Sequence, residues 1–248
     1  MCGASAMSGI EDRYDRARGL IAGQPDPGTV GGTAGVLRRL CGAAVQTMAA
    51  SGAGVTLMTG DGVRGAGAAS DSGSARLEEL QFTFGEGPCV DAYASRRPVL
   101  MPELADDAMT RWPVYAPAVH AEGVRAVFAF PLQIGAARLG VLDVFRDRAG
   151  ALTSDELRQG VLLAEVTVAA LLDRHERDGA DAGVDDLDEA VEGRAELFQA
   201  QGMVMVQLGV SIGEAMARMR AYAYAQDRRL SDLARDVVAR RLRFDPDH

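Results

Sequence analysis

The sequence contains no lysine: all 26 of its basic side chains, among 248 residues, are arginines. Cysteine and histidine are also scarce, with only Cys2, Cys41 and Cys89 and three widely separated histidines. Scattered cysteines exclude a disulfide framework and favour a reducing cytoplasm. Because there is no CxxC pair and no cluster of histidines, we expect no metal site of the structural zinc type.

Long apolar runs are missing as well. No stretch reaches the roughly twenty apolar residues that a membrane helix needs, so we expect no membrane span. The N-terminal residues lack the basic start and the apolar segment of a signal peptide. The motifs of serine hydrolases, zinc proteases, P-loop NTPases and dinucleotide-binding folds are absent too, and we therefore expect no enzymatic activity.

The charge is distributed unevenly along the chain. The net charge is −9, yet residues 197–244 hold eight arginines against four acids, a local charge of +4 that leaves −13 elsewhere. The overall acidity argues against a chain that coats nucleic acid along its whole length. The basic C-terminal segment instead predicts an interaction module.

The chain is 48% hydrophobic, which is enough for one or two cores. Stretches rich in Gly and Pro, or in Gly and Asp, mark the expected boundaries. They predict a helix and linker over residues 1–29, a first domain over 30–177, a linker over 178–186 and a second domain over 187–248.

The first domain alternates helical and strand patterns. The apolar spacing predicts helices over 33–50, 74–81, 113–122 and 154–177, and strands over 53–59, 63–69, 99–101, 124–133 and 138–146. The Gly60-Asp61-Gly62 turn joins the first two strands into a hairpin, and the last two strands form the clearest hairpin of the chain. This order predicts an α+β domain with an antiparallel sheet flanked by helices.

The second domain has only helical patterns, over 187–208, 211–225 and 231–242, with a capping box from Ser211 to Glu214. Glycine costs about 1 kcal/mol relative to alanine inside a helix, yet Gly202 lies within the first of them. We interpret Gly202 as a packing notch, at which the missing side chain lets a neighbouring helix approach closely. The expected packing set is Ala200, Gly202, Met205, Ala215, Ala223 and Ala234.

Four spaced blocks in this region carry a family resemblance. They are Ala200-Gln201-Gly202 with Met205, Ser211 with Glu214-Ala215, Met219-Arg220 with Tyr222-Ala223, and Leu230 with Asp232 and Ala234. This pattern resembles the ANTAR domain, although Gln201 stands where that family commonly has lysine. The resemblance implies an all-α three-helix bundle that binds leader stem-loops of RNA in transcription antitermination.

RNA loops are recognised by phosphate contacts and by stacking on aromatic rings or arginine planes. The candidate RNA-binding residues, which lie off the apolar stripes, are Arg218, Arg220, Tyr222, Tyr224, Arg228 and Arg229. The alternative is a solvated arginine face, with Tyr222 packed beside the core.

The first domain shows a second resemblance. Residues 81–92 read QFTFGEGPCVDA and precede Arg97-Pro98-Val99, a pattern that is similar to GAF domains that stand before ANTAR modules. The resemblance implies a sensor with a pocket for a small molecule that we cannot name. The candidate pocket residues are Cys89, Asp91, Trp112 and Tyr115, and no cofactor is identified. Cys89 is either a redox-sensing thiol at a helix N-terminus or a small buried residue.

Together these patterns predict a cytoplasmic, signal-responsive antiterminator whose long helix from residue 154 joins sensor and bundle. The apolar positions 157, 161, 164, 168 and 171 favour a homodimer that pairs through this helix, or a helix that covers the sheet. Two other functions stay open. One is a DNA-binding regulator with a helix-turn-helix module, and the other is a ligand- or redox-sensing module whose tail mediates protein contacts.

Overall fold

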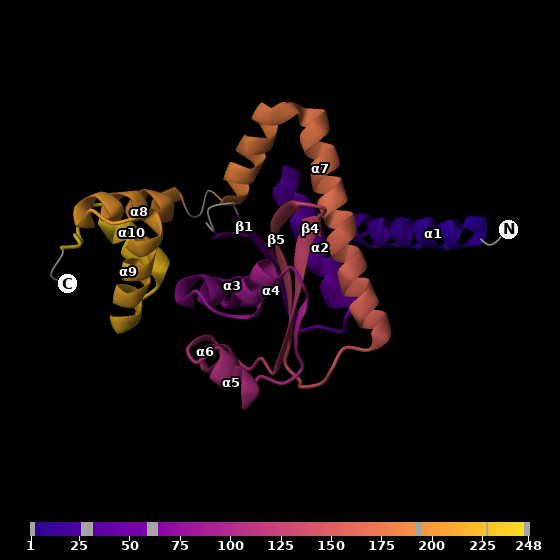
Figure 1. Ribbon diagram of the computed structural model, residues 1–248, viewed down its shortest axis with the longest axis horizontal. Coiled ribbons are helices and arrows are strands. Elements are labelled where there is room, and N and C mark those ends of the chain that lie inside the picture. The colour runs from indigo at the N-terminus through magenta and orange to yellow at the C-terminus, as the bar shows by residue number, and fades with distance from the viewer. Residues whose placement is uncertain (1–2, 26–31, 59–63, 192–194, 227, 246–248) are drawn as a thin grey trace. The chain divides into compact units, whose positions relative to one another are not determined.

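The computed structural model describes residues 3–25, 32–58, 64–191, 195–226 and 228–245 (Figure 1). The chain divides into two compact units, the first ending at Ala190 and the second beginning at Val191. The Gly60-Asp61-Gly62 turn lies outside the described residues.

A five-stranded antiparallel sheet forms the centre of the first unit. Its strands are β1 (Gly52–Met58), β2 (Arg64–Ala69), β3 (Val99–Met101), β4 (Ala126–Ile134) and β5 (Ala137–Arg146), in the order β2-β1-β5-β4-β3. The predicted hairpin of the last two strands is confirmed, because β4 pairs with β5 along its whole length. This order places β5 in the middle of the sheet, between β1 and β4, so a polar side chain on β5 is flanked by a strand on each side and lies far from the sheet edges.

Helices cover both faces of this sheet. The helices of this unit are α1 (Gly3–Ala22), which packs on α2, and α2 (Gly32–Thr47), α3 (Ser72–Phe84), α4 (Pro88–Ser95), α5 (Asp107–Arg111), α6 (Tyr115–Ala121) and α7 (Ser154–Val191). Figure 1 shows α2 and α7 on one face and α3 to α6 on the other. Because side chains alternate along a strand, Phe128 and Phe130 enter the core with α2 and α7, whereas Val127 and Ala129 enter the core with α3 to α6. The predicted α+β class is confirmed.

The second unit is a bundle of α8 (Ala195–Leu208), α9 (Ile212–Ala225) and α10 (Leu230–Val238). Ala200, Ala215, Ala223 and Ala234 are all buried, as the packing set predicts. The hydroxyl of Ser211 accepts a hydrogen bond from the backbone of Glu214 at 3.2 Å and so caps α9. The predicted three-helix bundle is therefore confirmed.

One predicted boundary is wrong. The helix that was expected to end near Arg177 continues to Val191, so the segment 178–186, which was predicted to be a linker, is helical. Its two glycines cost only about 1 kcal/mol each relative to alanine, and the alanines and acids around them are compatible with a helix. Within the region 187–208 that was predicted to be helical, α7 extends to Val191 and α8 covers Ala195–Leu208, while residues 192–194 lie outside the described residues.

The interpretation of Gly202 as a packing notch is wrong as well. A Cβ atom added at Gly202 would meet, beyond its own turn of helix, no atom of the described residues within 4 Å, so none of the described helices of the bundle requires a glycine there. The buried face of α8 contains Leu197, Ala200 and Val204, whereas Met205 is only half-buried. Apolar residues occupy two adjacent faces of α8. The spacing of apolar residues indicated the face of Gly202 and Met205, which is next to the face that is buried.

Candidate functional site

The bundle exposes part of its cationic and aromatic surface on α9 and at the start of α10. Arg218 is exposed and lies 3.5 Å from Glu214, one turn earlier on α9. Tyr224 is 65% exposed, and Arg220, one helical turn before it, lies on the same face of α9. Arg229 is exposed at the N-cap of α10 and makes no ion pair with another described residue. These side chains supply positive charge and one accessible ring.

The other two candidates in this region take part in the fold. Arg228 donates to the Oδ2 of Asp236 at 2.5 Å, and Arg241 donates to the second oxygen of the same carboxylate at 2.8 Å. The hydrogen bonds from Arg228 and Arg241 lower the pKa of Asp236. Tyr222 is half-buried and packs on Phe244, with 5.3 Å between ring centroids. Arg228 and Tyr222 therefore hold α10 and the segment after it against α9.

Gln201 and Phe244 have structural roles that the sequence pattern did not indicate. The buried amide of Gln201 donates to the carbonyl of Ile212 at 2.8 Å, which joins α8 to the start of α9. The backbone of Phe244 donates to Gln207 at 2.9 Å, and its ring is buried. An aromatic residue in an otherwise polar tail was the only available signal for Phe244.

In the first unit, Asp91 ties α4 to α5. Its Oδ2 accepts from Arg111 at 2.8 Å and from the indole of Trp112 at 3.2 Å. The guanidinium of Arg111 also lies 4.9 Å from the centre of the Trp112 ring. Trp112 is 1% exposed and Tyr115 is fully buried, with their rings edge to face at 6.3 Å. Trp112 and Tyr115 are therefore core side chains.

The glycine-rich loop before α4 is held by two polar side chains. The carboxylate of Glu86 accepts from the backbones of Val114 and Tyr115 at 2.7 and 2.9 Å, at the start of α6. The amide oxygen of Gln81 accepts from the backbone of Cys89 at 2.8 Å. Only glycine fits at position 87, where φ is +133° and an added Cβ would lie 2.6 Å from Gln81.

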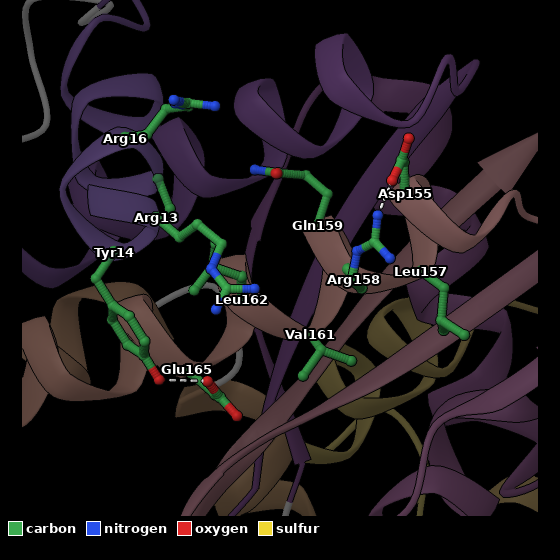
Figure 2. Close-up of a pocket in the computed structure, with 11 residues that line it drawn as sticks. Arg13, Tyr14, Arg16, Asp155, Leu157, Arg158, Gln159, Val161, Leu162 and Glu165 are labelled. Carbon is green, nitrogen blue, oxygen red and sulfur yellow. Dashed lines mark hydrogen bonds and ion pairs between the residues drawn. The ribbon is translucent and has the colours of Figure 1, made fainter. Parts of the chain in front are cut away.

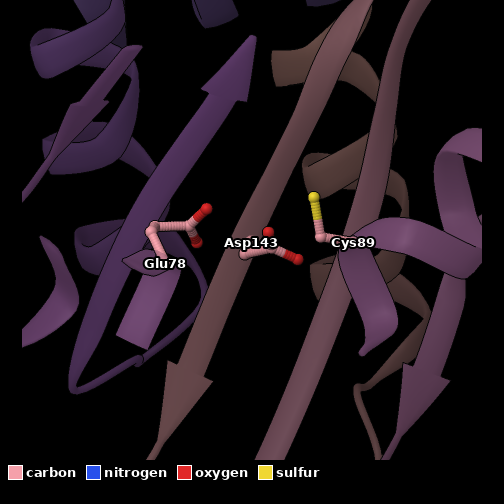
Figure 3. A group of neighbouring side chains, drawn as sticks. All are labelled: Glu78, Cys89 and Asp143. Atoms are coloured by element: carbon pink, nitrogen blue, oxygen red, sulfur yellow. The ribbon is translucent and has the colours of Figure 1, made fainter. Parts of the chain in front are cut away.

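Behind this loop, Gln81 reaches a buried polar cluster. Its amide nitrogen donates to the Oδ2 of Asp143 on β5 at 3.1 Å. Figure 3 shows Glu78, Cys89 and Asp143 together at this point; their ligand-type atoms lie within 4.8 Å of one another. Burial raises the pKa of Asp143, and the charge of Glu78 raises it further. A single acid in the apolar strand sequence RLGVLDVFR was the signal for this cluster.

A separate groove runs between α1 and α7, with a volume of about 760 Å³. Figure 2 shows its mixed lining, in which Tyr14 donates to Glu165 at 2.6 Å. This hydrogen bond raises the pKa of Tyr14. None of the four predicted pocket residues lines this groove. The groove combines cationic, acidic and apolar side chains from two helices.

Comparison with known families decides the identity of the two units. A model of the GAF domain matches residues 33–172, which is more than half of the chain, and a model of the ANTAR domain matches residues 185–238. The chain belongs to the GAF domain family. Its C-terminal bundle is an ANTAR domain, the type of domain that binds RNA in antitermination, whereas GAF domains are sensors. Domains of both types are generally non-enzymatic.

Solved structures agree with this fold. The GAF domain from a phosphoenolpyruvate-protein phosphotransferase of Coxiella burnetii is 16% identical, with a TM-score of 0.51, over 69% of this chain and 96% of that chain. The corresponding GAF domain from Acinetobacter is 12% identical, with a TM-score of 0.50, over 67% and 95%. At these identities the likeness concerns the fold alone. Among curated proteins, no relative matches.

Within the ANTAR domain, the six candidate RNA-binding residues fall into two groups. Arg218, Tyr224 and Arg229 are exposed and Arg220 is half-buried beside Tyr224, whereas Tyr222 and Arg228 are engaged in packing and ion pairing. Within the GAF domain, Asp91, Trp112 and Tyr115 form one interlocked group, and Cys89 lies in the polar cluster. In the part of the chain that the structure describes, none of the helices combines the length and apolarity that a bilayer crossing requires.

Proposed function

We propose that this protein is a signal-responsive transcription antiterminator, which binds RNA stem-loops in nascent transcripts, and hence acts in the cytoplasm. The observation that carries the proposal is the exposed group Arg218, Tyr224 and Arg229 on a domain of the ANTAR type. Arginines can contact the phosphates of a stem-loop, and an exposed tyrosine can stack on a base that is turned out of the loop.

The GAF domain supplies the regulation in this proposal, by binding a small molecule whose identity is open. We further propose that the protein acts as a homodimer, since two ANTAR domains on one particle bind paired stem-loops with higher apparent affinity than one. Ala164 and Val168 on α7 are buried against the sheet, but Val161 is 36% exposed and lines the groove of α1 and α7. Dimer contacts along α7 would therefore involve Val161.

The experiment is a binding titration with an RNA hairpin that is first selected from a random-loop pool on the full chain. Replacing Arg218 and Arg229 together by alanine should weaken binding. It should also reduce the slope of log affinity against log salt by about 1 for each of the two arginines that binds a phosphate. Arg97→Ala, which removes an exposed arginine of the GAF domain, is the matched control and should leave both quantities unchanged.

The same titration separates the alternatives. Tighter binding to a duplex DNA of the same sequence would favour a DNA-binding regulator. Unchanged RNA affinity in the folded double variant would favour a sensing module whose tail contacts proteins.

A further inference from the structure

We propose that Glu78, Cys89 and Asp143 form a site for a divalent transition-metal cation of the zinc or iron(II) class in the core of the GAF domain. The three residues come from α3, α4 and β5, and one ligand-type atom of each lies within 4.8 Å of the other two (Figure 3). This site is independent of RNA binding, since it involves the GAF domain alone.

The charge of this buried cluster favours a bound cation. Glu78, Cys89 and Asp143 are each at most 1% exposed, and an ionised carboxylate loses a large hydration energy when it is buried. A single bound dication offsets both carboxylate charges at once. It also stabilises the thiolate form of a cysteine, which is the form that binds metals.

Hydrogen bonds from neighbouring side chains hold both carboxylates of the cluster in place. The hydroxyl of Thr56 donates to one oxygen of Glu78, and the amide of Gln81 donates to Oδ2 of Asp143. Oδ1 of Asp143 is buried and has no hydrogen-bond partner among the described residues. Side chains that hold a carboxylate oxygen in place from outside, as Thr56 and Gln81 do here, are the usual outer shell of a metal site.

An independent observation comes from Tyr115. Its hydroxyl is completely buried and has no hydrogen-bond partner within the described ranges. Tyr115 and Cys89 belong to the same buried core cluster. Buried hydroxyls are normally hydrogen-bonded. A buried hydroxyl without a partner in the same core cluster as Cys89 is what a bound ion or its water would satisfy.

The donor set indicates the class of metal. Thiolate is a soft ligand that favours zinc and iron(II) over magnesium and calcium, and carboxylates are accepted by both. In a tetrahedral site with Zn–S near 2.3 Å and Zn–O near 2.1 Å, two ligand atoms lie roughly 3.5 Å apart. The three ligand-type atoms lie within 4.8 Å of one another, so metal binding requires the side chains to draw together by up to roughly 1 Å.

The test uses the full chain with Cys2→Ser, which leaves Cys41 and Cys89 as its thiols. After chelator treatment the protein is titrated with Zn²⁺ and, separately, with Co²⁺, whose thiolate charge-transfer absorption reports a sulfur ligand. We expect one equivalent per chain and a cobalt–thiolate band. Cys89→Ala should abolish the band and weaken Zn²⁺ binding by roughly 100-fold or more, and Asp143→Asn or Glu78→Gln should weaken it by at least about 10-fold.

Cys41→Ala is the matched control, because Cys41 is equally buried but lies on α2, outside the cluster. It should keep the band and the stoichiometry. Absence of a cobalt–thiolate band in the Cys2→Ser protein would overturn the proposal whatever the variants do. So would a band that survives Cys89→Ala but disappears in Cys41→Ala. RNA affinity is measured in parallel. Loss of the metal site should leave it unchanged, so the metal-site proposal can fail while the RNA-binding proposal holds.

Discussion

At the scale of single residues, two neighbouring arginines of the ANTAR domain have different surroundings. Arg228 is ion-paired with Asp236 on α10, whereas Arg229 is exposed at the N-cap of the same helix. A charge that is already neutralised by the protein has less to offer a phosphate. Arg228 and Arg229 are equivalent by residue type. Their side-chain surroundings, which the sequence does not reveal, give them different roles.

Replacing these two residues separately should give opposite results. Arg228→Ala should lower the melting temperature of the ANTAR domain, because it removes one of the two arginines that hold Asp236. Arg229→Ala should leave the melting temperature unchanged and weaken RNA binding. Thermal unfolding and hairpin titration of both variants measure this, and equal loss of RNA affinity without loss of stability in Arg228→Ala would contradict it.

Gly202 gives a second prediction at this scale. Since an added Cβ meets nothing within 4 Å, Gly202→Ala should raise the free energy of unfolding of the bundle by up to about 1 kcal/mol. The control is Gly209→Ala, which should destabilise, because φ at Gly209 is +67°. Urea unfolding of both variants measures the effect. A destabilised Gly202→Ala protein would restore the interpretation of Gly202 as a packing notch.

At the scale of elements, an ion pair fixes the start of α7 to the sheet. Arg146, at the end of β5, donates to Glu156 and to the carbonyl of Met48, and both partners of the pair are largely buried. Burial alone would raise the pKa of Glu156, but hydrogen bonds from Thr153 and Arg146 outweigh it and lower the pKa. The pair therefore adds stability in a pH-dependent way.

The sign of this dependence follows from linkage. A carboxyl group with a lowered folded-state pKa adds stability above its unfolded pKa, near 4.3, and loses it as the pH falls through the folded value. Glu156→Gln should lower the free energy of unfolding by roughly 1–3 kcal/mol at pH 7, and the difference should shrink as the pH falls below about 4.3 and vanish only below the folded-state pKa of Glu156. Asp155→Asn, in an exposed ion pair with Arg158, should change little. Urea unfolding across this pH range would contradict the account if the Glu156→Gln difference persisted in acid.

Elements were predictable from sequence where the pattern admitted one solution. The alternation of residues 138–146 defined β5 and its hairpin, and Ser211 defined the start of α9. The pattern did not predict the end of α7, because the free-energy cost of its glycines in a helix is small. It also did not predict the buried face of α8, because two faces of that helix are apolar. Asp143 was marked by its place as a single acid in an apolar strand, but the other two members of the Glu78–Cys89–Asp143 cluster were not predictable, because they come from α3 and α4 and join it only in the folded domain.

At the scale of the whole molecule, the proposed homodimer makes a prediction about mass. Val161→Glu should shift the full chain from dimer toward monomer, because Val161 is an exposed apolar residue of α7 that lines the groove with α1. Val206→Glu, a change at a 75% exposed valine of the ANTAR domain, is the matched control. Sedimentation velocity measures both. A protein that is monomeric before any substitution, or that only Val206→Glu dissociates, would contradict dimerisation through α7.

The central claim is that the ANTAR domain acts on RNA to prevent termination, and single-round transcription in vitro tests it most directly. The template carries the selected hairpin upstream of a terminator. We predict that the full chain increases read-through, that the Arg218→Ala, Arg229→Ala double variant does not, and that Arg97→Ala acts like the unchanged protein. Read-through that is unaffected by the protein, or equally increased by the folded double variant, would contradict the account.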